Sequence, residues 1–279
     1  MCALLVIGLT TAASSPVAPA TFEGAAVTQV RVLQMNLCNS GFAGCYTGRS
    51  VITGAAVIRA EAPDVVTLNE VCRNDMALLE HAFADGNHVG TTASVFQPAR
   101  DRRTGAAFRC DNGEPYGIGL VTRRSSTSAA LASSSGIYPA QDARDPEERA
   151  WVCLEGVGVE ACTTHLANTD AAVAEAQCRY LFGTVIPEVR AKGGPAHAVL
   201  GGDLNLQVGG SPDLRSCVPD GDRRADDGGV QNVVVTSEFG IASHQALSMD
   251  GTTDHPGLLV TVDYATPRPT SSDAVPTAV

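Results

Sequence analysis

Five short stretches of the sequence carry polar residues of the types that bind metal ions or move protons. Each stretch follows a run of apolar residues, so each lies where a predicted strand ends. Functional side chains are often found at strand ends in layered α/β proteins, because rigid strands hold them and the adjoining loops leave them accessible. The residues are Asn36, Glu70, His165, the pair Asp203 and Asn205, and the pair Asp254 and His255.

The stretch AVLGGDLNL at 198–206 holds the densest of these groups. Its first three residues are apolar and predict a short buried strand. Gly201 and Gly202 lack side chains and allow another part of the chain to approach closely. If the chain stays extended, Asp203 and Asn205 leave the same face. A carboxylate beside a carboxamide suits the binding of a water molecule and a phosphate oxygen, although an isolated GGDxN equally fits a strand that ends in an Asx turn.

Taken in chain order, the five stretches resemble the motifs of the endonuclease/exonuclease/phosphatase superfamily, which has the DNase I-like fold. They are QMNL at 34–37, LNE at 68–70, TTHL at 163–166, GGDLN at 201–205 and TDHP at 253–256. The resemblance implies an α/β fold, a four-layered sandwich of two packed mixed β-sheets flanked by helices. It also implies hydrolysis of phosphodiesters or phosphomonoesters with Mg²⁺, with Mn²⁺ or Ca²⁺ as alternatives.

The resemblance implies a metal site built from oxygen ligands. Glu70 is expected to be the main metal ligand, with Asn36 supporting it at the metal site or touching the phosphate. Asp254 is expected to ligate the metal or to orient a neighbouring residue. This agrees with the preference of hard divalent cations for carboxylate and amide oxygens, with water as the remaining ligands.

The same resemblance assigns catalytic roles to four residues. Asp203 is expected to hold or deprotonate the attacking water, and Asn205 to bind a phosphate oxygen beside it. His165 is expected to donate a hydrogen bond to the leaving group or to a phosphate oxygen. His255 is expected to act on the phosphate as a base or as a protonated partner.

Two further positions are expected near the substrate. Arg149 lies where many relatives carry an arginine close to the phosphate. The stretch YGIGLVTR, which begins at Tyr116, resembles a family strand of the form YGNAxLSR, with Gly119 and Val121 as departures.

One position departs from the family pattern. The family usually has an aspartate one strand before the final DH motif, where it pairs with the catalytic histidine. Here the run VQNVVV at 230–235 puts Asn232 in that place, and Asn232 is therefore expected to lie at the histidine and the substrate. An asparagine can hold an imidazole by a hydrogen bond but cannot stabilise an imidazolium by charge. Either Asp226 or Asp227 substitutes, or the histidine is tuned differently, or activity is reduced.

The charge balance limits the choice of substrate. The chain of 279 residues has a net charge of -11, which argues against tight, sequence-independent binding of polyanions. It does not exclude a hydrolase that contacts phosphates through a metal ion. Nucleic acid is the leading predicted substrate. The alternative is a lipid head group or another small phosphodiester, as in the sphingomyelinase-like branch of the family, and a further alternative is a catalytically weakened binding component.

The N-terminus and the cysteines both predict a secreted protein. Residues 1–20 combine an apolar run with an A-x-A site and read as a signal peptide, although no Lys or Arg precedes Arg31. The apolar run is too short for a stable membrane span. Eight cysteines follow Cys2, an even set at long spacings that favours disulfides. We expect a monomer whose partner is the phosphodiester substrate.

The expected disulfides differ in how well the sequence supports them, because eight cysteines allow 105 pairings. A two-residue turn at 157–158 would place Cys153 directly opposite Cys162 on neighbouring strands. Cys38 and Cys45 would close a short Gly-rich loop. Cys72–Cys110 and Cys178–Cys217 are then the pairs that remain in chain order.

Apolar periodicity and turn residues predict the elements that position these side chains. Uniform composition indicates one domain over residues 27–265, followed by a disordered tail at 266–279. Segments 86–115 and 209–229 read mainly as loops. Strands are predicted at 27–36, 64–70, near Val95, and at 116–122, 125–135, 149–154, 159–165, 198–200, 233–236 and 258–262. Helices are predicted from Thr47 or Ser50 to Ala62, from about Asn74 to Ala84, and from Asp170 to about Arg190 with a bend before Pro187.

Overall fold

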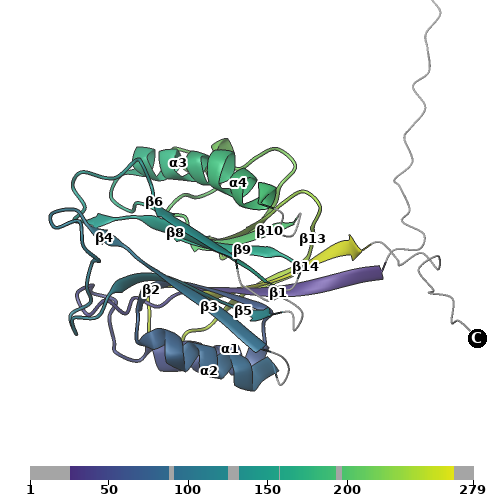
Figure 1. Cartoon of the computed structure of the whole chain (residues 1–279), viewed down its shortest axis with the longest axis horizontal. Helices are drawn as coiled ribbons and strands as arrows, with labels where there is room; N and C mark the ends of the chain where they lie inside the picture. Colours follow the sequence, from purple (N-terminus) through teal and green to yellow (C-terminus); the bar gives the residue numbers. More distant parts are fainter. Residues whose placement is uncertain (1–25, 88–90, 125–131, 157, 193–196, 267–279) are drawn as a thin grey trace, which may run out of the picture.

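The computed structural model describes residues 26–87, 91–124, 132–156, 158–192 and 197–266. The predicted signal peptide and all but the first residue of the predicted tail lie outside these ranges. The described strands and helices form a four-layered sandwich, in which two mixed sheets pack face to face and helices cover both outer faces (Figure 1). This confirms the predicted architecture. None of the described helices has the length and apolar character needed to cross a membrane.

The first sheet has six strands within the described ranges, in the spatial order β13-β14-β1-β2-β5-β3. β1 and β2 are parallel and the other pairs are antiparallel. Helices α1 (Ser50–Glu61) and α2 (Asp75–Asn87) pack on its outer face through apolar side chains such as Ile58 and Leu79. The strands are β1 (Ala26–Asn36), β2 (Val65–Cys72), β3 (Thr91–Pro98), β5 (Tyr116–Arg124), β13 (Gly240–Leu247) and β14 (Gly257–Thr266).

The second sheet also has six strands within those ranges, in the order β11-β12-β10-β9-β8-β6, with β9 and β10 parallel. A short ribbon of β4 (Arg100–Asp101) and β7 (Glu147–Glu148) lies beside the two sheets, and a single 3₁₀ turn, η2 (Leu214–Ser216), precedes β11. The strands are β6 (Ser133–Ile137), β8 (Ala150–Glu155), β9 (Glu160–His165), β10 (Ala198–Asp203), β11 (Arg223–Asp226) and β12 (Gln231–Val235).

The predicted long helix after β9 is present and is interrupted where the sequence indicates. Asp170 caps the N-terminus of α3 (Ala171–Tyr180) by accepting from two backbone N–H groups. A π-helical stretch, η1 (Leu181–Val185), follows, and α4 (Ile186–Ala191) contains Pro187. Because proline has no N–H to donate to the preceding turn, the hydrogen-bond ladder shifts immediately before it. These helical segments cover the second sheet.

The two glycines of β10 allow close approaches on both sides of the strand, Gly201 to the other sheet and Gly202 to the neighbouring strand β9. A Cβ atom at position 201 would lie 2.1 Å from the Oγ1 atom of Thr67 on β2, and one at position 202 would lie 2.5 Å from the backbone oxygen of Thr164 on β9. No larger residue fits at Gly201 without separating the sheets. The close approach predicted for this glycine pair is therefore confirmed, and at Gly201 it brings β10 against β2 of the other sheet.

All eight cysteines of the described chain form disulfides, in the four predicted pairs. Cys153 and Cys162 face each other in the β8–β9 register, with Cα atoms 4.0 Å apart. The other pairs are Cys38–Cys45, Cys72–Cys110 and Cys178–Cys217.

Some elements differ from the sequence-based expectation. The edge strand β13 was not predicted, because most of its side chains are exposed and leave no alternating apolar pattern. β11 lies within the segment expected to be a loop. The strand expected at 125–135 begins only at Ser133, and positions 125–131 lie outside the described residues.

The environment of Glu160 allows a prediction of how the stability of the folded protein depends on pH. It is buried at the start of β9, directly opposite Glu155 on β8. Burial and, to a smaller extent, the charge of Glu155 raise the pKa of Glu160, Lys192 opposes the shift, and the net result is a pKa of about 7. The folded pKa lies above the unfolded one, so the stabilisation is complete below about pH 4.5 and is lost as pH rises through 7. We expect the melting temperature of Glu160→Gln, relative to the unmodified protein, to rise between pH 5 and about pH 8. A constant difference across this range would contradict the assignment.

Candidate active site

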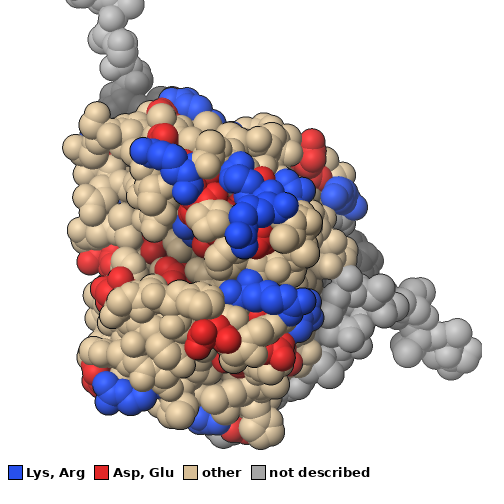
Figure 2. All heavy atoms as spheres, turned by 90° about the vertical axis from the view of Figure 1, so that its left-hand side faces the viewer, with Lys and Arg blue, Asp and Glu red and all other residues tan. Residues whose placement is uncertain are grey.

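The carboxyl ends of four central strands meet at one edge of the sandwich. β1 and β2 are parallel neighbours in the first sheet, and β9 and β10 are parallel neighbours in the second. The loops beyond these ends surround an open cleft of about 630 Å³. On this face, acidic side chains lie across the middle and basic side chains gather mainly on the upper half (Figure 2). Predicted site residues that line the cleft are Glu70, Tyr116, Arg149, His165, Asp203, Asn205, Asp254 and His255.

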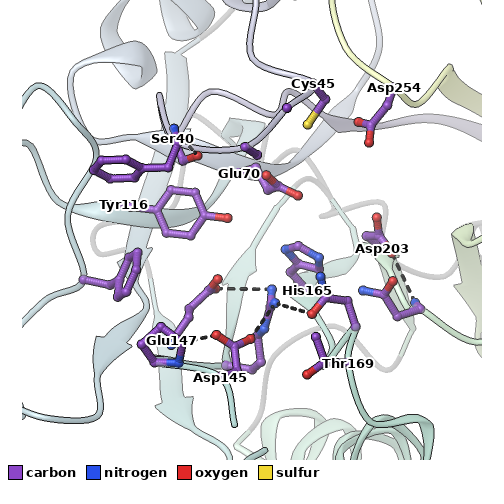
Figure 3. Close-up of a pocket in the computed structure, with 18 of the residues that line it drawn as sticks. Ser40, Cys45, Glu70, Tyr116, Asp145, Glu147, His165, Thr169, Asp203 and Asp254 are labelled. Atoms are coloured by element: carbon purple, nitrogen blue, oxygen red, sulfur yellow. Dashed lines mark hydrogen bonds and ion pairs between the residues drawn. The ribbon is translucent and has the colours of Figure 1, made fainter.

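Glu70 reaches the cleft because β2 is irregular at its end. The pairing of β2 with β5 shifts between Leu68 and Val71, and Glu70 has the left-handed backbone angle φ 56°. A bulge of this kind redirects side chains. Asn69 therefore points between the two sheets, whereas the Glu70 carboxylate points into the cleft (Figure 3).

Asn36 joins two carboxylates across the cleft floor. Its Nδ2 atom donates to Glu70 Oε1 at 2.9 Å and to Asp203 Oδ2 at 3.1 Å. Its Oδ1 atom accepts from the Cys38 backbone N–H at 3.0 Å, which fixes the orientation of the amide. Asn36 thus supports the carboxylates through its nitrogen. These contacts place the Asn36 amide between Glu70 and Asp203 and leave its oxygen one lone pair that the Cys38 N–H does not use.

Asp203 is only 1% exposed. Burial raises the pKa of its carboxyl group, while the nearby His255 and several hydrogen bonds act in the opposite direction. The Nε2 atom of His255 lies 3.5 Å from Asp203 Oδ2. Asn205 adopts a left-handed backbone, donates its N–H to Asp203 Oδ1 at 3.1 Å and donates its side-chain amide to Leu166. A buried carboxyl group and an imidazole therefore lie side by side at the cleft floor.

His165 and Arg149 form a second buried pair of basic groups. Burial, followed by the charges of Arg149 and His255, lowers the pKa of His165 well below its usual value, so this imidazole is neutral at pH 7. The Arg149 guanidinium lies 3.1 Å from Asp145 and 3.3 Å from Glu147. His165 can therefore donate one hydrogen bond without carrying a charge.

Tyr116 lies at the start of β5, at the other end of the cleft. Burial raises its pKa well above the usual value, with the Glu147 charge as the next cause. Its ring contacts Phe108 edge to face at a centroid distance of 5.8 Å. The hydroxyl group points into the cleft (Figure 3).

Asn232 does not reach the cleft. Along β12, Val233 packs between the sheets and Val234 packs toward the helices, so Asn232 faces the helices and Gln231 faces the cleft floor. Asn232 donates to the Val230 carbonyl, and its own oxygen has no partner among the described residues. The expectation that Asn232 contacts the histidine or the substrate is therefore wrong, because the strand register turns it to the opposite face.

Neither Asp226 nor Asp227 replaces the missing carboxylate. Asp226 pairs with Arg224, and Asp227 accepts backbone N–H groups of Gly229 and Gln231. Within the described ranges, the carboxylates paired with His255 are Asp203 itself and Asp254, the latter at 3.8 Å. Asp203 thus occupies the position beside the imidazole.

The structure also brings forward residues that the sequence reasoning left out. Gln231 donates a hydrogen bond to Asp203 from below the cleft floor. Asp145 and Glu147 form ion pairs with Arg149. Phe42 lines the cleft and is 64% exposed. Gln231 is the neighbour of Asn232, the residue that the sequence analysis considered. Because neighbouring residues face opposite sides of a strand, considering both residues would have included Gln231. No sequence signal marks Phe42.

The donor set fits a hard divalent cation. Glu70, Asp203 and Asp254 all line the cleft, and the two aspartates raise the pKa of Glu70 further after burial has raised it. A cation would relieve this repulsion between carboxylates, and oxygen ligands are those that Mg²⁺ prefers. Asp254 also lies near Cys38 and Cys45, but these sulfur atoms form a disulfide and are not available as thiolate ligands.

Comparison with known proteins identifies the fold. The sequence matches no family model and no curated protein. The structure is similar to an endonuclease/exonuclease/phosphatase protein from Beutenbergia cavernae, with a TM-score of 0.64 and 21% identity over 87% of this chain and 73% of that one. It is also similar to a mannosyl-6-phosphatase from Bacteroides thetaiotaomicron, with a TM-score of 0.57 and 13% identity over 84% of this chain and 99% of that one.

A third similar structure is a truncated TDP2 from Caenorhabditis elegans, with a TM-score of 0.55 and 17% identity over 84% of this chain and 97% of that one. Each similarity extends over most of this chain and includes both sheets. Together with the layer order, they show that this chain has the same fold as these proteins, the DNase I-like fold.

Proposed function

We propose that the protein is a divalent-metal-dependent phosphoesterase that acts on phosphodiesters. The observation that carries this proposal is the bridge made by Asn36, which holds Glu70 and Asp203 on the floor of one cleft, with His255 3.5 Å from Asp203. One carboxylate suits a metal ion, and the other suits a water molecule. Mannosyl-6-phosphatase is among the proteins with a similar fold, which supports phosphoester hydrolysis.

Each residue then has a role that its surroundings support. Glu70, with Asp254 nearby and Asn36 as support, would hold Mg²⁺, which supplies positive charge at the phosphate when it is bound. Asp203 accepts the proton of the attacking water. His255 lies beside Asp203 and contacts the phosphate.

The other wall of the cleft would bind the remaining phosphate oxygens. Asn205 lies next to Asp203 and is a candidate for one of them. The neutral His165 donates a hydrogen bond to another oxygen, and Arg149 adds positive charge behind it.

The leading substrate in this proposal is nucleic acid. The cleft is open and its mouth carries the exposed ring of Phe42, with Phe108 and Tyr116 further inside. Flat aromatic side chains stack with nucleobases of any sequence. A strand whose phosphate sits at Glu70 and Asp203 would pass through the same cleft that Phe42 lines.

Phe42→Ala tests this substrate. We expect kcat/KM for a single-stranded oligonucleotide to fall about 10-fold, because a stacked base contributes about 1–3 kcal/mol. Hydrolysis of bis(p-nitrophenyl) phosphate should change by less than roughly twofold, since it has no nucleobase. Ile52→Ala is the matched control, because Ile52 is equally exposed at 67% and does not line the cleft. An equal loss on both substrates, or no loss on either, would count against stacking at Phe42.

A small phosphodiester with a cationic head group is the second candidate. The net charge of -11 and the carboxylates of Asp145 and Glu147 on the cleft wall disfavour long polyanions. A lipid or small-molecule phosphodiester with an amine or quaternary ammonium group would not meet this repulsion. Release of the phosphorylated head group from lipid vesicles, without degradation of polynucleotide, would identify this substrate.

The disulfides support an oxidising location. Four disulfides in a chain of this size are uncommon in reducing compartments. We therefore infer that the protein is secreted, as the N-terminal sequence predicts. Cleavage after residue 20 of the exported protein would be the direct measurement.

Hydrolysis by the purified protein tests the proposed function. Bis(p-nitrophenyl) phosphate, plasmid DNA, RNA and phospholipid vesicles are incubated with Mg²⁺, with EDTA, and with EDTA followed by excess Mg²⁺. We expect turnover of at least one phosphodiester that EDTA abolishes and Mg²⁺ restores. Turnover that survives EDTA, or stabilisation by Mg²⁺ without turnover on any substrate, would overturn the proposal and leave a binding component.

A further inference from the structure

A closed ring of buried polar side chains lies directly beneath the cleft. Its members come from four strands in both sheets: Gln34 on β1, Asn69 on β2, Asp203 on β10 and Gln231 on β12. None of the four is more than 1% exposed. Buried amides are unfavourable unless their hydrogen bonds are made, so each contact in the ring matters for the fold.

The hydrogen bonds run around the ring without a gap. Gln231 Nε2 donates to Asp203 Oδ2 at 2.7 Å, and Gln34 Nε2 donates to Gln231 Oε1 at 2.9 Å and to Asn69 Oδ1 at 2.7 Å. The Asp203 backbone N–H donates to the same Asn69 Oδ1 at 2.7 Å and closes the ring. Asp203 is therefore held by residues of both sheets, its carboxylate by Gln231 and its backbone N–H by Asn69.

Backbone groups fix the direction of every amide in the ring. The N–H of Asp203 requires the oxygen of Asn69 to face it, and the nitrogen of Asn69 donates to the Thr164 carbonyl. Gln34 must then present its nitrogen to Asn69, while its oxygen accepts from the Thr67 hydroxyl. Its second N–H faces the Gln231 oxygen, so the Gln231 nitrogen can point only toward Asp203.

Packing alone does not require a glutamine at this position. Two residues further along the same face of β12, the inward side chain is Val233, which is fully buried in the core between the sheets. A polar side chain at 231 instead meets the one carboxylate that lies 3.5 Å from His255. One member of the ring, Asp203, is therefore also part of the cleft.

We propose that Gln231 is a positioning residue, which orients the Asp203 carboxylate for proton transfer in the phosphoesterase reaction; this inference rests on the function proposed above. Gln231 and Asn36 both donate to Oδ2, and the Asn205 N–H donates to Oδ1. Together they set the plane of the carboxylate. Gln231 faces inward on β12, and it acts through Asp203 without touching substrate.

Gln231→Met tests the inference, because methionine keeps the size and removes the donor. We expect kcat to fall about 10- to 100-fold, as for other supporting residues, and KM to change by less than roughly twofold. In an Asp203→Asn background, the same change should alter the residual rate by less than roughly twofold, since Gln231 would act through the missing carboxylate. Equal losses in both backgrounds would overturn the inference. Val233→Ala is the control for stability, and it should lower the melting temperature without lowering kcat.

A structural measurement separates this inference from the proposed function. In a crystal structure of full-length Gln231→Met, the Asp203 carboxylate should be rotated relative to the unmodified protein, and in Val233→Ala it should not. An unrotated carboxylate would overturn the positioning role even in an active enzyme. A rotated carboxylate in a protein that hydrolyses no phosphodiester would support the positioning of Asp203 and refute the proposed function.

Discussion

Replacing Asp203 with Asn should lower kcat for phosphodiester hydrolysis by about 10³-fold, within the range of 10² to 10⁴ known for the loss of a general base. The carboxylate next to His255 is the proposed proton acceptor, and an amide of the same size cannot take a proton from water at neutral pH. KM should change little, because Asp203 is proposed to act on the water and not to bind the substrate. Steady-state kinetics with bis(p-nitrophenyl) phosphate measure both constants.

The fold should survive this substitution. Asp203 is 1% exposed and burial already disfavours its charged form, so a neutral amide removes a desolvation penalty while it weakens the hydrogen bonds from Gln231 and Asn36. Asp85→Asn on the outer helix α2 is the matched control, because it removes a carboxylate far from the cleft. If Asp203→Asn kept full activity with an unchanged circular dichroism spectrum, the site would have to be sought elsewhere.

Replacing Glu70 with Gln should abolish stabilisation by Mg²⁺. We expect the Mg²⁺ affinity to fall on the order of 100-fold, because a proposed ligand loses its charge. At a Mg²⁺ concentration a hundred times the Kd, the unmodified protein should gain about 2.7 kcal/mol of stability, and the variant should gain little. Thermal melts with and without Mg²⁺, together with titration calorimetry, measure these effects.

The same variant should be at least as stable as the unmodified protein when no metal is present. Glu70 is half-buried, and Asp203 and Asp254 both repel its charge, so a neutral side chain relieves this repulsion. Glu80→Gln, which alters a carboxylate on α2, should leave the response to Mg²⁺ unchanged. A Glu70→Gln protein that Mg²⁺ stabilises as much as before would show that the cation binds at another place.

The buried ring explains how a site of this kind is kept rigid. The cleft floor joins two sheets, and a shift of one sheet against the other would separate Glu70 from Asp203. Asn36 joins the two carboxylates at the surface of the floor, and Gln34, Asn69 and Gln231 join the same strands one layer below. Two levels of hydrogen bonds therefore resist that movement.

Two disulfides hold the loops that leave this floor. Cys38 follows Asn36 by two residues and Cys72 follows Glu70 by two residues, and both are bonded to cysteines in loops around the cleft. Cys45 is itself among the residues that line the cleft, on the same loop as Phe42. The loop that carries the exposed ring is therefore fixed at both ends.

Much of the fold could be predicted from local patterns. The apolar runs of β1, β2 and β10 mark buried strands, Asp170 marks a helix start, and Pro187 marks the interruption of the helix that follows. These signals depend on neighbouring residues only, so they can be read without the tertiary structure. β13 could not be predicted, because its stability comes from pairing with β14 and not from burial of its own side chains.

The sequence by itself determined which residue types stand at the strand ends, and the order of their motifs indicated the fold. Only the tertiary structure decided where those side chains point. Successive residues of a strand face opposite sides of the sheet. The residue at the cleft floor is therefore Gln231 and not its neighbour Asn232, which the sequence analysis had considered. A bulge in β2 turned Glu70 outward and Asn69 inward for the same reason. Side-chain direction depends on register and on pairing between distant strands, and a single sequence carries neither.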